Sequence, residues 1–166
     1  MGSLIILPDG SVSYLHDLDP VPSRSALNQG DRIERLEDVT IFQGCSRRQL
    51  QALARITEEF DAPAGTILTR AGDPGEEFFL IVEGAARVEV SPNRRLRLQS
   101  GDYFGEMSLL DRQPRSATVV AETPIRLLVI DRRSFATLLD EVPGLIHRLL
   151  VALSRRVRNA ERTLNG

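Results

Sequence analysis

The sequence predicts a mainly β fold, an antiparallel β-roll of jelly-roll type that is flanked by helices and interrupted by one short helix. Three observations lead to this fold class. Short runs rich in β-branched and aromatic residues are separated by recurring glycines, namely Gly65, Gly72, Gly75, Gly84, Gly101 and Gly105. Several of these runs alternate polar and apolar residues, which is typical of half-buried strands. Segments with a helical spacing of apolar residues precede and follow them, and the last such segment is long.

The first 30 residues form an N-terminal extension that differs from the rest of the chain. The stretch LIILPDGSVSYL has two short apolar runs around Pro8, Asp9 and Gly10, whose turn chemistry predicts a small hairpin. The following DLDPVPSRSALNQGD carries prolines among scattered polar residues and is typical of a linker. Because an isolated hairpin is only marginally stable, we expect it to pack on the roll.

Two helices are predicted before the strands. In DRIERLEDVTIF, the apolar residues Ile33, Leu36 and Val39 have helical spacing. In CSRRQLQALARITEEF, Ser46 and Gln49 form the pattern of a capping box at a helix start. The apolar face of this second helix comprises Leu50, Leu53, Ala54 and Ile56.

The predicted strands lie between residues 60 and 130, in the runs TILT, FFLIVEG, AARVEV, RLRLQ, SATVVAE and IRLLVI. Among them, GEMSLLD has the periodicity of a short helix. A helix follows in DRRSFATLLDEV, and a longer one begins at Pro143, since proline is tolerated in a first helical turn. We therefore divide the chain into the extension (1–30), the roll with its helices (31–142) and the C-terminal helix (143–166).

Composition and charge restrict the class of protein. Of 166 residues, 42% are hydrophobic, enough to bury a core without a metal or a disulfide. The single cysteine, Cys45, excludes an intramolecular disulfide and suits a reducing compartment. No run approaches the ~20 apolar residues of a membrane span, and the N-terminus lacks the features of a signal peptide. We therefore expect a cytoplasmic protein with no membrane segment. The net charge of −2 provides no basic field for nucleic acid.

The placement of titratable residues argues against an enzyme. A β-roll metalloenzyme needs histidine and glutamate ligands clustered on neighbouring strands. The two histidines, His16 and His147, fall in the predicted linker and in the last helix. The scattered acidic residues form no pair for general acid–base catalysis. We therefore predict no catalytic residue, no metal and no cofactor.

One stretch, FGEMSLLDRQPRSATV (residues 104–119), combines an acid and a base with small residues inside core-like sequence. Gly105 permits a sharp turn or a close backbone approach, and the short helix after it begins with unpaired N–H groups. The guanidinium of Arg115, with the backbone amides of Ser116 and Ala117, provides the donors that a phosphate needs. Glu106 would repel the same phosphate, so its partner would be a hydroxyl. The pattern favours a ligand with an anion and a hydroxyl, and the alternative is a structural ion pair between Glu106 and Arg115.

This stretch resembles the phosphate-binding cassette of cyclic nucleotide-binding domains. Such domains occur in bacterial catabolite-activator-type regulators, in the regulatory subunit of cyclic-AMP-dependent kinase and in nucleotide-gated channels. The resemblance extends to APAGTILTRAGDPGEEFFLIVEGAARVEV and to DRRSFATLL, and it covers about residues 38 to 160. It implies the β-roll fold and a cyclic nucleotide as the ligand.

The resemblance also implies a role for each matched residue. Glu106 would accept a hydrogen bond from the ribose 2′-OH, and Arg115 would pair with the cyclic phosphate. Leu109 and Leu110 would fasten the short helix to the roll, and the last helix would cover the base as a lid. The base would contact strand residues such as Val82, Val88 and Leu98. The predicted ligand-binding residues are Phe104, Gly105, Glu106, Met107, Ser108, Arg115, Ser116 and Ala117.

The identity of the base is less closely defined by the resemblance. A hydroxyl at Ser116 can reach a guanine amino group, as threonine does in cyclic-GMP-binding relatives, but serine also occurs in cyclic-AMP binders. We therefore expect cyclic AMP in preference to cyclic GMP. From the last helix, Ser154, Arg155 and Arg158 are candidates for contact with the base.

The last helix also carries a heptad seam, formed by Ile146, Leu150, Leu153, Val157, Ala160 and Leu164. This seam predicts either a homodimer through residues 143–164 or packing within one subunit. The resembling transcription factors continue into a helix-turn-helix after this helix, for which the sequence leaves no room. We therefore expect no direct DNA binding.

The function predicted from the sequence is that of a cyclic-nucleotide sensor that passes a reordering of its last helix to an effector protein. Two alternatives stay open. The chain is the regulatory part of a larger enzyme, channel or transcription factor, or it is a dimerisation roll that has lost nucleotide binding. A binding measurement separates the last alternative from the others.

Overall fold

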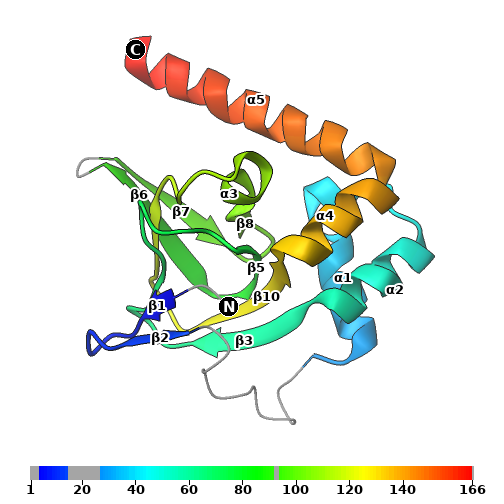
Figure 1. Cartoon of the computed structure of the whole chain (residues 1–166), viewed down its shortest axis with the longest axis horizontal. Helices are drawn as coiled ribbons and strands as arrows, with labels where there is room; N and C mark the ends of the chain where they lie inside the picture. Colours follow the sequence, from blue (N-terminus) through cyan, green and yellow to red (C-terminus); the bar gives the residue numbers. More distant parts are fainter. Residues whose placement is uncertain (1–3, 15–26, 92–93, 166) are drawn as a thin grey trace.

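Two antiparallel sheets form a β-roll in the structure, a computed structural model that describes residues 4–14, 27–91 and 94–165 (Figure 1). The six-stranded sheet has the order β2-β1-β4-β9-β6-β7, with β1 (Leu4–Ile6), β2 (Val12–Tyr14), β4 (Ile67–Thr69), β6 (Ala85–Ser91), β7 (Arg94–Gln99) and β9 (Thr118–Ala121). The four-stranded sheet has the order β3-β10-β5-β8, with β3 (Glu58–Ala62), β5 (Glu77–Glu83), β8 (Tyr103–Phe104) and β10 (Ile125–Asp131). The predicted fold class is confirmed.

Strands β5 and β10 are buried on both faces, because the roll interior lies on one side of them and helices lie on the other. Leu127 and Val129 of β10 belong to the roll interior together with Phe79 of β5. Leu128 and Ile130, which alternate with them, pack in the helical core. This double burial explains why FFLIV and LLVI are continuous apolar runs rather than alternating ones.

The helices that pack on the outer face of β5 and β10 are α1 (Gln29–Glu37), the 3-10 helix η2 (Thr40–Phe42), α2 (Arg47–Ile56), α4 (Arg132–Glu141) and α5 (Pro143–Asn165). Helix α3 (Glu106–Asp111) is inserted between β8 and β9. The capping box predicted for α2 is present, since the side chains of Ser46 and Gln49 each accept from the other's backbone N–H. Helix α1 begins at Gln29, where the side chain of Asn28 accepts from the N–H of Asp31.

Helix α2 is shorter than its sequence pattern predicts. It ends at Ile56, and the next residue, Thr57, has extended backbone. Ile56 is exposed, so its predicted place on the buried face was wrong. The residues that follow form β3, which the sequence pattern assigned in part to the helix.

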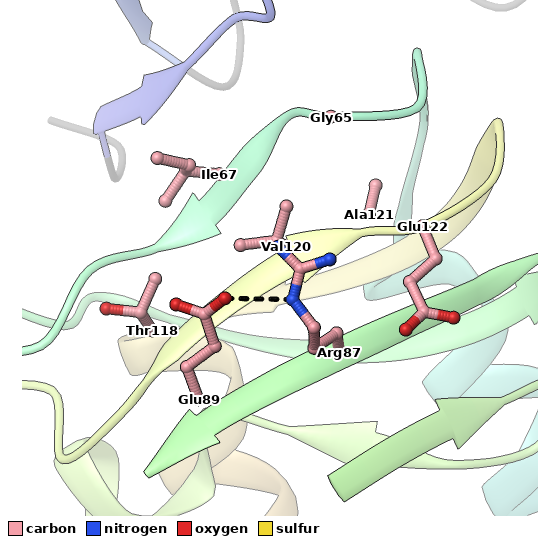
Figure 2. Close-up of a pocket in the computed structure, with 8 residues that line it drawn as sticks. All are labelled: Gly65, Ile67, Arg87, Glu89, Thr118, Val120, Ala121 and Glu122. Atoms are coloured by element: carbon pink, nitrogen blue, oxygen red, sulfur yellow. Dashed lines mark hydrogen bonds and ion pairs between the residues drawn. The ribbon is translucent and has the colours of Figure 1, made fainter. Parts of the chain in front are cut away.

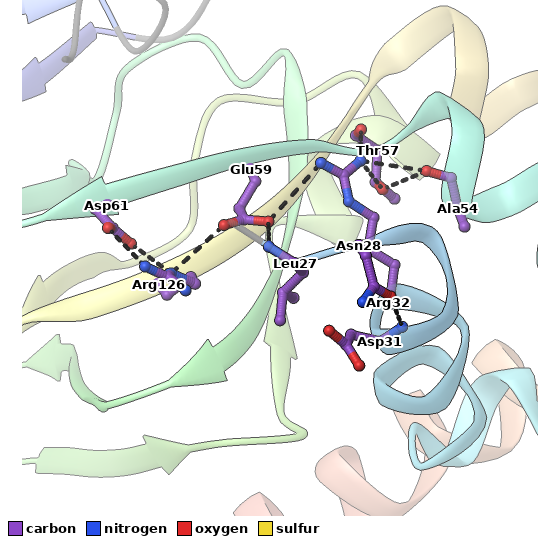
Figure 3. A network of polar contacts seen from close by, with 9 residues as sticks. All are labelled: Leu27, Asn28, Asp31, Arg32, Ala54, Thr57, Glu59, Asp61 and Arg126. Atoms are coloured by element: carbon purple, nitrogen blue, oxygen red, sulfur yellow. Dashed lines mark hydrogen bonds and ion pairs between the residues drawn. The ribbon is translucent and has the colours of Figure 1, made fainter. Parts of the chain in front are cut away.

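A polar network explains how the acidic strand β3 is held in the fold (Figure 3). Arg126 of β10 donates to Asp61 at 2.8 and 3.0 Å and lies 3.5 Å from one carboxylate oxygen of Glu59. The other oxygen of Glu59 accepts from the backbone N–H of Leu27 at 2.9 Å, and Arg32 of α1 lies 3.8 Å from it. The hydrogen bond to Asp61 is the main cause of the raised pKa of Arg126. The network fixes α1 and the roll to one another.

The N-terminal hairpin is part of the six-stranded sheet. Strand β1 pairs with β2 and also with β4, where Ile6 lies opposite Ile67. Ile5 is fully buried in the roll interior, so the predicted packing of the hairpin on the roll is confirmed. The predicted linker falls largely on residues 15–26, outside the described residues. Among the described helices, none has the length and apolar character that a membrane crossing demands.

Candidate functional site

The candidate site is built around α3, which follows directly on β8. Gly105 precedes the helix in a left-handed conformation with φ +93°, which glycine adopts without strain. A Cβ at this position would lie 2.7 Å from the carbonyl oxygen of Glu77 and 2.9 Å from Nη1 of Arg115. Glycine is therefore required here both by backbone conformation and by the close approach of Arg115.

Arg115 is held inside the protein by backbone carbonyls. The residue is only 5% exposed, and its side chain donates from Nη1 to the carbonyl of Gly105 at 3.0 Å and from Nη2 to the carbonyl of Glu77 at 2.9 Å. The carboxylate of Glu77 lies 3.9 Å from Nη2, and the guanidinium carbon lies 5.6 Å from the ring centroid of Phe79. Burial lowers the pKa of Arg115, and the charges of Glu77 and Glu106 oppose this effect. The guanidinium is thus a fixed, enclosed positive charge next to the start of α3.

The loop between β4 and β5 wraps the backbone of Arg115. The N–H of Arg115 donates to the carbonyl of Asp73 at 2.8 Å, and its carbonyl accepts from Gly72 at 2.9 Å. There is no space for a side chain at Gly75 of this loop, because a Cβ there would lie 2.6 Å from both Arg115 Nε and Ser108 Cβ. Two of the glycines between the predicted strands, Gly75 and Gly105, therefore serve the close packing around Arg115.

Glu106, the first residue of α3, is 2% exposed and is paired with an arginine from the other end of the chain. Its Oε1 accepts a hydrogen bond from Nη1 of Arg156 on α5. The guanidinium of Arg156 also lies over the ring of Tyr103, 5.7 Å from its centroid. Burial, followed by the negative charge of Glu106, raises the pKa of Tyr103, while the charge of Arg156 opposes this rise. In the site, Glu106 is thus paired with Arg156, and Arg115 with Glu77. The sequence analysis had left open a structural ion pair between Glu106 and Arg115 as the alternative to ligand binding.

The other predicted binding residues surround α3 in different ways. Phe104 is buried and stacks on Phe79, with ring centroids 4.7 Å apart. Ser108 is buried, whereas Met107 is exposed. Ser116 is exposed, and its hydroxyl donates to the sulfur of Met107 at 3.8 Å. The structure thus brings the eight predicted residues into one region, with Gly105 and Ala117 taking part through their backbone carbonyls, to Arg115 and Thr69 respectively.

Two expectations about packing near the site were wrong. Leu109 packs against the helical core, but Leu110 is exposed and does not fasten α3 to the roll. Val82 lies in the helical core, on the face of β5 that points away from the roll interior. Val88 and Leu98 do pack against the roll interior.

A residue that the sequence analysis did not single out makes the contact between α5 and α3. The contact of Ser154, Arg155 or Arg158 with a base stays a prediction. Ser154 donates to the carbonyl of Leu150 within its own helix, and Arg155 and Arg158 are exposed. Arg156 is the arginine that the structure places on Glu106. Five arginines lie on this helix, and helical periodicity alone does not distinguish the one that faces α3.

A hollow of about 510 Å³ lies elsewhere, on the outer face of the six-stranded sheet (Figure 2). Arg87 and Glu89 form an ion pair within it at 2.8 Å, so these charged groups satisfy each other. No residue of the candidate site lines it. Within the described ranges, no group of three or more His, Cys, Asp or Glu side chains is gathered as a metal site requires. The hollow is lined by Gly65, Ile67, Arg87, Glu89, Thr118, Val120, Ala121 and Glu122.

The chain is similar to known proteins in sequence. The family model of the cyclic nucleotide-binding domain matches residues 59–142. A cAMP-dependent protein kinase regulatory subunit of Hypocrea atroviridis is 30% identical over 150 residues, which cover 87% of this chain and 32% of that protein. The chain spans about a third of the length of the curated relatives that it matches.

The chain is also similar to solved structures. The catabolite activator protein of Thermus thermophilus has a TM-score of 0.69 and 31% identity, covering 75% of this chain and 61% of that chain. The regulatory domain of Toxoplasma gondii PKA, solved with cAMP, has a TM-score of 0.66 and 25% identity, covering 75% of this chain and 50% of that chain. The matched segment 59–142 contains α3 and the eight predicted binding residues, and the chain therefore belongs to the cyclic nucleotide-binding domain family.

Proposed function

We propose that this chain is a cyclic-nucleotide sensor whose ligand binds between Glu106 and Arg115. The observation that carries the proposal is the burial of two opposite charges beside one short helix, each almost fully removed from water. Burial lowers the pKa of Arg115, and ionisable groups with perturbed pKa values are concentrated at functional sites. The match of the family model to this segment supports the same reading.

Each charge has a distinct role in the proposal. Arg115 pairs with the cyclic phosphate, and its bonds to the carbonyls of Gly105 and Glu77 fix the plane of the guanidinium for that purpose. Glu106 accepts a hydrogen bond from the ribose 2′-OH, because a carboxylate close to the phosphate would repel it. The backbone amides of residues 105–108 and 116–117 add donors for the phosphate oxygens. The role is one of binding and regulation rather than catalysis.

We propose cyclic AMP as the preferred ligand, with cyclic GMP as the alternative. The Toxoplasma gondii regulatory domain, which shares the fold, was solved with cAMP. The hydroxyl of Ser116, the group suited to a guanine amino group, is turned toward Met107. A preference for cyclic AMP agrees with that orientation.

The output of the sensor is a reordering of α5 that stabilises one of two conformers when nucleotide is bound. Its partner is an effector protein or a second copy of the chain. A second copy is supported by the exposed seam of Ile146, Leu150 and Val157, of which the last two are each 57% exposed. Paired helices bury residues at this spacing.

Calorimetric titration with cyclic AMP and cyclic GMP tests the proposal. The wild type is compared with Arg115→Ala, and Arg133→Ala on the exposed face of α4 serves as the control for loss of one positive charge. Removing one partner of a buried charge pair costs ~2–5 kcal/mol, so Arg115→Ala should bind at least about thirtyfold more weakly. Thermal unfolding of each variant separates a binding loss from a folding loss. A wild type that binds neither nucleotide would favour the dimerisation roll instead.

A further inference from the structure

The one methionine that the structure describes stands at the surface of the candidate site. Met107 is the second residue of α3, directly after Glu106, and it is 41% exposed. The chain has one other methionine, Met1, which lies outside the described residues, and one cysteine, Cys45. Cys45 packs against the helical core and is only partly exposed. An oxidant in solution can therefore reach the side chain of Met107 without any opening of the fold.

The sulfur of Met107 connects the two segments that supply the site. Ser116, the residue after Arg115, is exposed, and its hydroxyl donates to Sδ of Met107 at 3.8 Å. In the proposed function, the backbone amides of residues 105–108 and 116–117 donate to the phosphate oxygens. The sulfur belongs to the first of these segments and contacts the second. A chemical change at this sulfur therefore acts on the part of the site where the anion binds.

We propose that Met107 is a site of reversible oxidation, at which a hydroperoxide converts the thioether to a sulfoxide and thereby lowers the affinity of the site for its nucleotide. This inference rests on the proposed function. The reactant is a small hydroperoxide, which needs no binding pocket of its own because Met107 is exposed.

The oxidation is a two-electron step. The sulfur attacks the terminal oxygen of the hydroperoxide, so that an S–O bond forms and the O–O bond breaks. The proton of the attacked oxygen passes to the leaving oxygen, which departs as water or an alcohol. The sulfur is thus oxidised and the hydroperoxide is reduced. Methionine sulfoxide reductases reverse the change and restore the thioether.

The new oxygen changes the charge distribution of the site. A thioether sulfur is only a weak acceptor, whereas a sulfoxide makes the side chain polar and places a partial negative charge on its oxygen. The hydroxyl of Ser116, which already contacts the sulfur at 3.8 Å, can donate to this oxygen and hold it beside residue 116. There the partial negative charge opposes a phosphate on the amides of residues 116–117, because like charges repel.

Peroxide treatment of the full chain tests the inference, in a Cys45→Ser background so that no thiol reacts. After treatment with hydrogen peroxide, mass spectrometry of peptides from the folded protein should show one added oxygen on Met107. Calorimetric titration should then give about tenfold weaker binding of cyclic AMP than before treatment, the size of one lost hydrogen bond to a charged group. Treatment with methionine sulfoxide reductases should restore the affinity.

Met107→Leu is the matched control, because leucine keeps an apolar side chain of similar volume and has no sulfur. Its affinity is compared only with its own value before peroxide treatment, and the two should agree within about twofold. Met1 is still present in this variant. A tenfold loss of affinity in Met107→Leu after treatment would therefore assign the effect to another residue and overturn the inference.

The outcomes separate this inference from the proposed function. If the untreated chain binds neither cyclic AMP nor cyclic GMP, the proposed function fails, and this inference fails with it. If the untreated chain binds but the chain oxidised at Met107 binds equally well, the inference is overturned and the proposed function stands. The same holds if Met107 does not react in the folded chain. Circular dichroism melting checks that the oxidised chain is folded at the temperature of the titration, and an unfolded chain would also overturn the inference.

Discussion

Replacing Gly75 by alanine should disable the site without altering any charged residue. A Cβ at this position would lie 2.6 Å from Arg115 Nε, 2.6 Å from Ser108 Cβ and 2.7 Å from Arg115 Cζ. Ordinary Cβ contacts begin at 3.4 Å, so Arg115 and Ser108 must both move by several tenths of an ångström. Arg115 is held by the carbonyls of Gly105 and Glu77, so this movement lengthens hydrogen bonds that are now close to 3 Å.

The size of the effect follows from these contacts. Overpacking of a close-packed region costs about 1–3 kcal/mol, and a weakened hydrogen bond from a charged donor adds to it. We therefore expect Gly75→Ala to lose about 2–3 kcal/mol of unfolding free energy. For a chain of this size, that loss lowers the melting temperature by about 5–10 °C. The affinity for cyclic AMP should fall at least about tenfold, because the guanidinium leaves its binding position.

Circular dichroism melting and calorimetric titration measure the two effects. Gly144→Ala is the matched control, since the nearest atoms to its Cβ belong to the flexible end of Arg148, at 3.1 Å. It should change the unfolding free energy by less than about 1 kcal/mol, in the stabilising direction, and leave the affinity unchanged. A Gly75→Ala variant with the melting temperature and affinity of the wild type would show that Arg115 is not confined as described.

Three further predictions follow from the contacts around the site and the helices. In a Tyr14→Phe background, Tyr103 should titrate above its ordinary pKa of about 10 by tyrosinate absorbance, because the fold favours its neutral form. The stability that the neutral Tyr103 contributes is complete below pH ~10 and is lost as the pH rises through the raised pKa. A titration midpoint of Tyr103 at or below ~10 would contradict the described burial. Arg126→Ala should cost about 2–3 kcal/mol in urea unfolding, since the buried carboxylate of Glu59 loses a partner. Arg87→Ala should cost less than about 1 kcal/mol, because the side chains of its pair with Glu89 are 30% and 33% exposed and solvent screens their charges. Leu150→Glu should convert a dimer to a monomer in sedimentation experiments with the melting temperature of the monomer unchanged, and a dimer that persists would exclude this seam.

Local patterns predicted the elements whose stabilising groups are close in sequence. The capping box of Ser46 and Gln49 is formed within one helical turn, and the alternation in AARVEV and RLRLQ is visible within each strand. Strand β3 was not predicted, because a run of acidic residues is not typical of a strand. In the fold, Arg126 and Arg32 lie beside Glu59 and compensate its charge. Those arginines lie on β10 and α1, and sequence gives no indication that the fold gathers them there.

The same limit applies to the site. Gly105, Glu106 and Arg115 belong to one continuous motif, so their proximity around α3 could be predicted. The contact of Arg156 with Glu106 could not be predicted, because it depends on the path of α5 over α3. Val82 was misplaced because β5 is buried on both faces, so a pattern of apolar residues cannot tell which of them point to the roll interior.

The central claim is tested most directly by calorimetric affinities of cyclic AMP and 2′-deoxy-cyclic AMP for the wild type and Glu106→Met. Methionine keeps the length of the side chain and removes its acceptor oxygens. If Glu106 accepts from the ribose hydroxyl, the wild type should bind the deoxy ligand about tenfold more weakly, and Glu106→Met should bind both ligands with similar affinity. Equal binding of the two ligands by the wild type, or the full preference retained in Glu106→Met, would contradict the assigned role of Glu106.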